Sequence, residues 1–210
     1  MDGVDPLLVE LPAELLTRRL RLVPPAPGDG LMVNRAIAES FAELNRWMDW
    51  AATMPSVIES ERFVRESAAR YLRRDDLPLF IRKRDTGEFV GASGMHRIDW
   101  NVPRFEIGYW CRTSLVGQGY VTEAVIALTR FAFETLHAAR VEIRTDVDNE
   151  RSWHIAQRLG FTLEGILRRD ARTAHGKLRD TRVYAITDLA DLRGEGGAAA
   201  TDARKTPARR

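Results

Sequence analysis

Two glycines separated by one residue, Gly117 and Gly119, stand between a strand-like run and a helix-like run of the sequence. Glycine lets the backbone turn tightly and approach a ligand closely, because it has no Cβ. The free N–H groups of a following helix point at such a turn, and the helix dipole favours negative charge there. The segment 114–124 could therefore hold a phosphate or pyrophosphate group. By itself, an ordinary turn without a ligand explains the pair better.

A second polar segment follows one strand and one helix later. Asn149, Ser152 and Ala156 share one face of a helix that is predicted to start at Asn149 and to end at Gly160. Asn149 is a good N-cap and Gly160 a good C-cap. Asn149 could serve only as a cap and Ser152 could be a tolerated helix serine, but a polar stripe of this kind can also face a ligand. The two segments together favour a ligand site.

Glu106 is the best candidate for a general base. In the predicted strand 104–111, alternation places Glu106, Gly108 and Trp110 on one face. A carboxylate that shares its strand face with a glycine and a tryptophan, on the strand next to the glycine turn, suits a base that works on a buried group. The alternative is a solvated carboxylate or the partner of a structural ion pair.

The elements that position these residues follow from hydrophobic periodicity and turn signals. Strands are expected at 19–23, 79–83, 89–98, 104–111, 141–147, 163–168 and 180–187, and helices within 29–46 and at 59–72, 121–136 and 149–160. This mixture predicts one α/β domain with a mixed sheet. We expect residues 1–13 to be flexible, 14–193 to form the domain, and 194–210 to be a disordered tail rich in Gly, Ala and charge.

Composition excludes several classes of protein. The chain has 32 basic and 30 acidic residues, and without residues 194–210 both counts are 28, so a dedicated nucleic-acid binder is not expected. Cys111 is the only cysteine, which excludes an intramolecular disulfide, and the four histidines lack metal-ligand spacing. We expect no metal. The absence of a signal-peptide pattern and of a long apolar run predicts a cytoplasmic protein without membrane contact.

The sequence resembles the GNAT superfamily of acetyl-CoA-dependent N-acetyltransferases over roughly residues 15–192, and most closely the Rim-type ribosomal-protein N-terminal acetyltransferases. The resemblance rests on six segments, each weak alone and specific together: Leu16-Thr-Arg-Arg-Leu-Arg-Leu22, Leu44–Trp50, Glu106-Ile-Gly-Tyr-Trp110, Gly117-Gln-Gly-Tyr-Val-Thr-Glu-Ala124, the run from Asn149 through Ser152 to Phe161, and the strand from Asp180 to Tyr184.

The resemblance implies an α/β (α+β) fold whose mixed, mostly antiparallel sheet of six to seven strands is flanked by about four helices and splays apart at the acyl-CoA site. It implies that Glu106 and Ser152 are catalytic. It further implies that acetyl-CoA is held by Trp110, Cys111, Arg112, Gly117, Gln118, Gly119, Tyr120, Val121, Thr122, Asn149 and Ser152. The acceptor could meet Trp47, Trp50 and Tyr184, for which core packing is the competing account.

Two positions depart from the family pattern. Ser114 stands where many members have Gln or Arg, three residues before the first glycine, but a backbone cradle does not need that side chain. Ala156 stands where many members carry a tyrosine that protonates the leaving thiolate, so that route is closed here. The Rim-type pattern places a serine one turn earlier, and Ser152 fills this position. Cys111 could act as a nucleophile, but a small buried strand residue is the better interpretation.

The resulting hypothesis is an N-acetyltransferase that acts on a primary amine, most simply a protein or peptide N-terminal α-amine, by direct attack in a ternary complex. A ribosomal protein would be a typical acceptor, and the resemblance alone suggests a homodimer. Small amines such as amino acids, polyamines or aminoglycosides, and acyl groups other than acetyl, stay open as alternatives. A non-catalytic acyl-CoA-binding protein and a pure interaction domain are the rivals from other classes.

Overall fold

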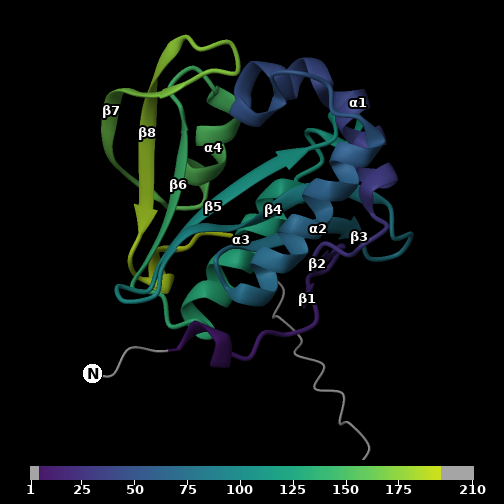
Figure 1. Ribbon diagram of the computed structural model, residues 1–210. Helices are drawn as coiled ribbons and strands as arrows, with labels where there is room; N and C mark the ends of the chain where they lie inside the picture. Colours follow the sequence, from purple (N-terminus) through teal and green to yellow (C-terminus); the bar gives the residue numbers. More distant parts are fainter. Residues whose placement is uncertain (1–4, 195–210) are drawn as a thin grey trace, which may run out of the picture.

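An eight-stranded sheet forms the centre of the computed structural model, which describes residues 5–194 (Figure 1). The strands are β1 (Leu15–Leu16), β2 (Leu20–Val23), β3 (Leu77–Lys83), β4 (Phe89–Asp99), β5 (Arg104–Cys111), β6 (Arg140–Asp146), β7 (Thr162–Arg172) and β8 (Leu178–Ile186). Their order across the sheet is β1-β2-β3-β4-β5-β6-β8-β7. Neighbouring strands are antiparallel except β5 and β6, which are parallel. The predicted mixed, mostly antiparallel sheet is confirmed.

The number of strands is a correction, because the sequence predicts six or seven. The additional strand, β1, consists of Leu15 and Leu16 paired with β2. Two residues carry no periodicity from which a strand could be recognised. Val9 and Leu11, in the segment expected to be flexible, pack against the core, and the Val9 carbonyl accepts a hydrogen bond from Arg74 at 3.2 Å. The expected tail lies outside the described residues beyond Gly194.

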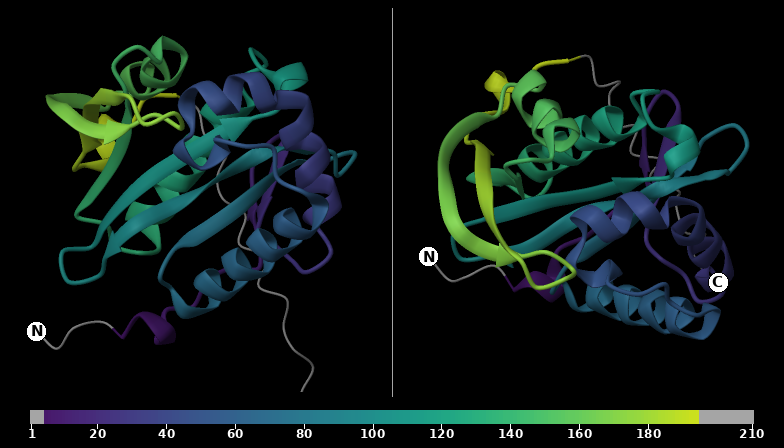
Figure 2. Two further views of the ribbon diagram at one scale, coloured as in Figure 1. Left: turned by 45° about the horizontal axis from the view of Figure 1, so that its top comes forward. Right: turned by 90° about the horizontal axis from the view of Figure 1, so that it is seen from above.

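Two pairs of helices cover the two faces of the sheet, as the view from above in Figure 2 shows. One pair is α1 (Gly30–Trp47) and α2 (Val57–Arg73), and the other is α3 (Tyr120–Glu134) and α4 (Glu150–Arg158). Strand residues alternate between the two sides: Phe80 joins the core under α1 and α2, whereas Leu79 and Ile81 join the core under α3 and α4. Burial of each such side chain contributes about 1.5–3 kcal/mol to the stability of the fold and holds both helix pairs against the sheet.

The sheet splits between its two parallel strands. Pairing of β5 with β6 is confined to Arg104, Phe105 and Glu106 of β5, which face residues 140–142 of β6. Beyond Glu106 the two strands continue to Cys111 and to Asp146 without pairing with each other. The backbone groups of β5 that face the gap are free to pair with an extended ligand, as a sheet edge does. This is the splay that the resemblance implies.

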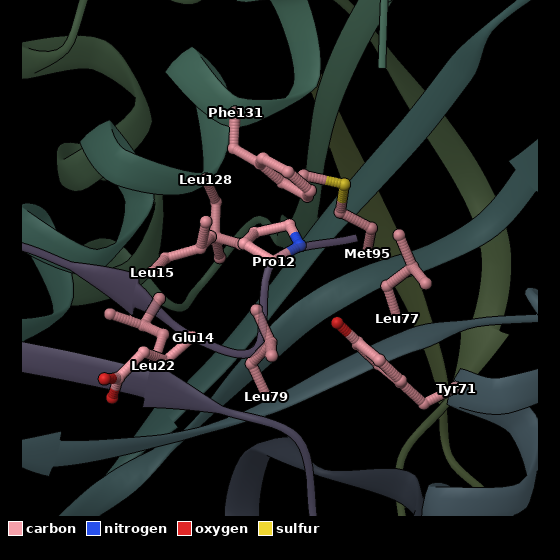
Figure 3. Close-up of a pocket in the computed structure, with 10 residues that line it drawn as sticks. All are labelled: Pro12, Glu14, Leu15, Leu22, Tyr71, Leu77, Leu79, Met95, Leu128 and Phe131. Atoms are coloured by element: carbon pink, nitrogen blue, oxygen red, sulfur yellow. The ribbon is translucent and has the colours of Figure 1, made fainter. Parts of the chain in front are cut away.

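A small apolar cavity lies between β1 and the sheet core (Figure 3). Its volume is about 10 Å³, and Pro12, Leu15, Leu77, Met95 and Phe131 contribute to its wall. A cavity of this size holds about one water molecule. It is a packing defect of the core, and the functional site lies elsewhere.

Candidate active site

The turn before α3 presents backbone N–H groups to solvent. Gly117 and Gly119 have φ values of +82° and +78°, a left-handed backbone that side chains with a Cβ rarely adopt. No side chain caps the start of α3. Within residues 5–194, the N–H groups of residues 117–122 donate to no protein acceptor, and the first one in use is that of Glu123. The turn and the first helical turn together form an anion cradle.

Arg19 and Thr17 fix the cradle to the first strands. The Glu123 carboxylate, in the first turn of α3, accepts hydrogen bonds from the Thr17 hydroxyl at 2.5 Å and from Arg19 Nε at 2.6 Å. Arg19 Nη1 also donates to the Gln118 carbonyl at 2.9 Å. The carbonyl side of the turn is therefore held by the protein, which leaves its N–H side for a ligand.

A cleft of about 1840 Å³ runs from the cradle past the split between β5 and β6 to the end of α1. Nine of the residues expected to hold the coenzyme line it: Trp110, Cys111, Gly117, Gly119, Tyr120, Val121, Thr122, Asn149 and Ser152. Five arginines line it as well: Arg18, Arg19, Arg130, Arg151 and Arg158. Of these, only Arg19 and Arg130 form ion pairs within residues 5–194. The cleft is therefore suited to a large ligand with several negative charges.

Ser152 is held by the start of α4 and by a tyrosine. Its N–H donates to the Asn149 side chain at 3.2 Å, so Asn149 is the N-cap of α4. The Ser152 hydroxyl donates to the Tyr109 hydroxyl at 3.2 Å, and Tyr109 donates to the Ser152 carbonyl at 2.9 Å. Burial raises the pKa of Tyr109 to about 12, so the phenol stays protonated.

Tyr109 is the site residue that sequence reasoning missed. The alternation of β5 places it on the face opposite Glu106, toward α3 and α4, and it lines the cleft. The family tyrosine is absent at Ala156, yet a phenol from another element reaches Ser152. The only signal in the sequence is this alternation, which does not reveal that α4 packs above Tyr109.

Glu106 occupies the last paired position before β5 and β6 separate. Burial raises the pKa of its carboxyl group, while Arg97 and Arg144 oppose this shift. The distances from Glu106 Oε2 to Arg97 Nε and Arg144 Nε are 3.5 and 3.9 Å. Oε2 is buried and has no hydrogen-bond partner within residues 5–194. Glu106 lies on the α1 and α2 side of β5 and is not part of the cleft wall that Tyr109 forms.

Two of the residues expected to hold the coenzyme lie outside the cleft. The Arg112 guanidinium pairs with Glu39 at 2.6 Å and with Glu88 at 3.1 Å, and its N–H donates to the Val90 carbonyl. The side chain and the N–H of Arg112 are thus bonded to protein partners. The exposed Gln118 contributes its carbonyl to Arg19 and does not line the cleft.

The other expected residues divide between the cleft and the core. Trp47 lines the cleft, whereas Trp50 is half-exposed outside it, with its ring centroid 6.5 Å from that of Trp110. Tyr184, expected to meet the acceptor, is buried in β8 at 2% exposure and does not line the cleft. Burial raises the pKa of Cys111 to about 11, so at neutral pH its thiol is protonated and poorly nucleophilic.

Two further properties concern the part of the chain that the structure describes. It contains no group of three or more His, Cys, Asp or Glu side chains placed to hold a metal ion. No helix in residues 5–194 has the length and apolar character needed to cross a membrane.

Comparisons with known proteins agree with this geometry. The family model described as an acetyltransferase (GNAT) domain matches residues 19–162. The ribosomal-protein-serine acetyltransferase of Escherichia coli (strain K12) is 31% identical over 143 residues, which cover 66% of this chain and 78% of that protein.

Solved structures show the same architecture. The microcin C7 self-immunity acetyltransferase MccE, in complex with acetyl-CoA and AMP, is 27% identical with a TM-score of 0.77, covering 81% of this chain and 93% of that one. RimL, the ribosomal L7/L12 α-N-protein acetyltransferase in complex with coenzyme A, is 25% identical with a TM-score of 0.76, covering 83% and 97%.

The residues present fit coenzyme A. The cradle N–H groups suit a pyrophosphate, the arginines suit its further phosphate, and the open edge of β5 suits its amide-containing arm. The chain therefore belongs to the GNAT acetyltransferase family and is an acetyl-CoA-dependent N-acetyltransferase.

Proposed function

We propose that this enzyme acetylates the N-terminal α-amine of a protein or peptide, by direct attack of the amine in a ternary complex. The observation that carries the proposal is the buried Glu106 Oε2, which lacks a hydrogen-bond partner within residues 5–194 at the point where the sheet splits. The relative named a ribosomal-protein-serine acetyltransferase supports the acceptor class, as does RimL, named for a ribosomal protein. A ribosomal protein in the cytoplasm is the acceptor we propose.

The acceptor class follows from the cost of deprotonation. An amine attacks a thioester only as the free base. At neutral pH a lysine side chain with a pKa of ~10.4 needs about 4–5 kcal/mol to lose its proton, whereas an α-amine with a pKa of ~8 needs about 1 kcal/mol. Glu106 is the single base that we assign, and one carboxylate suffices to deprotonate an α-amine.

The proposed base and the proposed donor to the leaving group lie on opposite faces of β5. Acetyl-CoA supplies the acetyl group as a thioester. Glu106 accepts a proton from the ammonium group, directly or through water, and the freed nitrogen lone pair forms the bond to the carbonyl carbon. The carbon–sulfur bond then breaks, and the nitrogen releases its second proton to solvent, which leaves a neutral amide. Ser152 Oγ, held by Asn149 and Tyr109, donates a hydrogen bond to the departing thiolate, which takes its proton from solvent. Trp47 forms the wall on the acceptor side of the cleft.

An acceptor screen tests the acceptor class. Purified enzyme and acetyl-CoA are incubated with N-terminal peptides of ribosomal proteins, with the same peptides blocked at the N-terminus but carrying a free lysine, and with small amines. Mass spectrometry should find one added acetyl group on the free N-termini. Acetylation confined to lysine side chains or to small amines would refute the proposed acceptor.

Replacement of Glu106 by Gln tests the base. We expect kcat to fall by about 10²–10⁴, the usual contribution of a general base, while calorimetry finds unchanged affinity for coenzyme A. Glu164→Gln is the matched control, because Glu164 is an acidic residue of β7 bonded to Arg140 and without contact to Glu106. Near-wild-type turnover in Glu106→Gln would remove Glu106 from the mechanism.

A further inference from the structure

Arg144 lies between Glu106 and the carboxylate of Asp170, which is two strands away from Arg144 in the sheet. It lies on β6 just beyond the split, and its side chain is 20% exposed. Its Nε is 3.9 Å from Glu106 Oε2 on β5, and its Nη2 donates to Asp170 Oδ2 on β7 at 2.7 Å. Because β8 lies between β6 and β7, the hydrogen bond from Arg144 to Asp170 crosses over β8.

The backbone of β7 is deformed where it supplies Asp170. The pairing of β7 with β8 shifts register between Leu167 and Ala171. Within this bulge Arg169 has a φ of +52°, and its N–H donates to Asp180 Oδ1 at 2.8 Å. A left-handed conformation at a residue with a long side chain is unfavourable and persists only where the surroundings impose it. Bulges of this kind redirect a side chain, here that of Asp170 toward Arg144.

Four charged or titratable groups surround Glu106. Arg97 and His96 face it from β4, and Glu142 and Arg144 face it from β6. The Arg97 side chain is 65% exposed, so solvent screens its charge, whereas Arg144 is mostly buried. Arg97 is the nearer cation and lowers the pKa of Glu106 more, and Arg144 adds a second, mostly buried cation whose charge solvent screens less.

The bond to Asp170 keeps Arg144 near Glu106 without a direct hydrogen bond. A guanidinium bonded to Glu106 at about 2.8 Å would occupy the oxygen that must accept the proton. Removal of the guanidinium would take away one of the charges that oppose the effect of burial, so the pKa of the carboxyl group would rise further. The observed gap of 3.9 Å avoids both outcomes.

We propose that Arg144, restrained by Asp170, is a positioning residue that keeps Glu106 ionised and its Oε2 free for the acceptor amine. This inference rests on the proposed function in its use of Glu106 as the base. The restraint itself concerns only the ionisation of Glu106, which can be measured without an acceptor.

The direct test is a titration of the Glu106 carboxyl carbon by ¹³C NMR in the full chain, with the resonance assigned by its loss in Glu106→Gln. In Arg144→Met the midpoint should move to higher pH, because a cation that favours the carboxylate is gone. Arg21→Met is the matched control, since Arg21 is a strand arginine paired with Glu14 and neither residue is among the groups that face Glu106. An unchanged or lowered midpoint in Arg144→Met would overturn the inference.

A second variant changes the midpoint in the opposite direction. Asp170→Leu keeps roughly the size of the side chain but offers no acceptor, which releases Arg144 to close the gap to Glu106. The midpoint of Glu106 should fall, a result that general loosening of the sheet would not produce. An unchanged midpoint would remove Asp170 from the inference, and the two variants also protect the test against one of them failing to fold.

Kinetics separate this inference from the proposed function. With an accepted peptide, Arg144→Met should lose roughly tenfold in kcat/KM on the acidic side of the pH profile and recover at higher pH, because Glu106 is active only when deprotonated. Arg144→Lys should restore part of the loss. If no amine is acetylated by the wild type, the proposed acceptor class fails, while the NMR titration still decides the role of Arg144.

Discussion

Glu39 joins helix α1, whose C-terminal end lines the cleft, to the turn that leads into the cradle. Its carboxylate accepts hydrogen bonds from Arg112 Nη2 and from the Ser114 hydroxyl, both at 2.6 Å, and from the Ser114 N–H at 3.1 Å. Hydrogen bonds from Arg112 and then from Ser114 hold the pKa of Glu39 at about 2, below the usual 4.5. Replacement of Glu39 by Gln removes the charge and keeps the shape.

The contribution of Glu39 to the free energy of unfolding follows from this pKa. A carboxylate with a pKa of about 2 in the folded chain and 4.5 in the unfolded chain would contribute at most about 3 kcal/mol at neutral pH. The side chains of Glu39 and Arg112 are 30% and 22% exposed, and solvent screening reduces the figure to about 1 kcal/mol. Because the folded pKa is lowered, this stability is present above about pH 4.5 and is lost as the pH falls toward 2.

A double-mutant cycle measures this contribution. Urea unfolding of wild type, Glu39→Gln, Arg112→Met and the double variant at pH 7 should give a coupling free energy of about 1 kcal/mol, which shrinks as the pH falls below about 4.5. The Arg130 and Glu134 pair of α3 is the control, an exposed i,i+4 pair expected to contribute about 0.3–0.5 kcal/mol. Additive effects of the two substitutions at pH 7 would refute the reasoning.

Three further predictions concern the cradle and the leaving group. Gly119→Val should weaken coenzyme A binding at least tenfold by calorimetry, because φ is +78° and the new Cβ lies 3.4 Å from Arg19 Nη2; unchanged affinity would argue against the cradle. Ser152→Ala should lower kcat about 10- to 100-fold with affinity kept, since its N–H still bonds to Asn149, and near-normal turnover would remove its role. Tyr109→Phe should cost about 1 kcal/mol of unfolding free energy and lower kcat less than Ser152→Ala does; a larger kcat loss than in Ser152→Ala would instead make Tyr109 the principal hydrogen-bond donor to the thiolate.

The fold could be predicted to a large extent, because its elements are long and periodic. The helix that begins at Tyr120 and the strand 104–111 agree with the pattern of apolar residues. β1 could not be predicted, since its two leucines form a strand only by pairing with β2. The predicted strand 163–168 continues to Arg172 in the structure, because pairing with β8 resumes after the bulge.

The cradle and the cap of α4 are the parts of the site that the sequence by itself determined. Gly117, Gly119 and Asn149 act on backbone groups within three residues of themselves, so their effect depends on local conformation that short sequences encode. The same holds for the alternation that places Glu106 and Tyr109 on opposite faces of β5.

Only the tertiary structure decided which side chains meet. Tyr109 and Ser152 are 43 positions apart, and Arg112 and Glu39 are 73 positions apart. Asp170 reaches Arg144 from a strand that is not its neighbour in the sheet. Such contacts depend on how helices cross the sheet and on where a strand bulges, and these arise from the packing of the whole core. The sequence therefore indicated the glycine turn and the helix cap, and the folded chain determined which side chains surround Glu106 and Ser152.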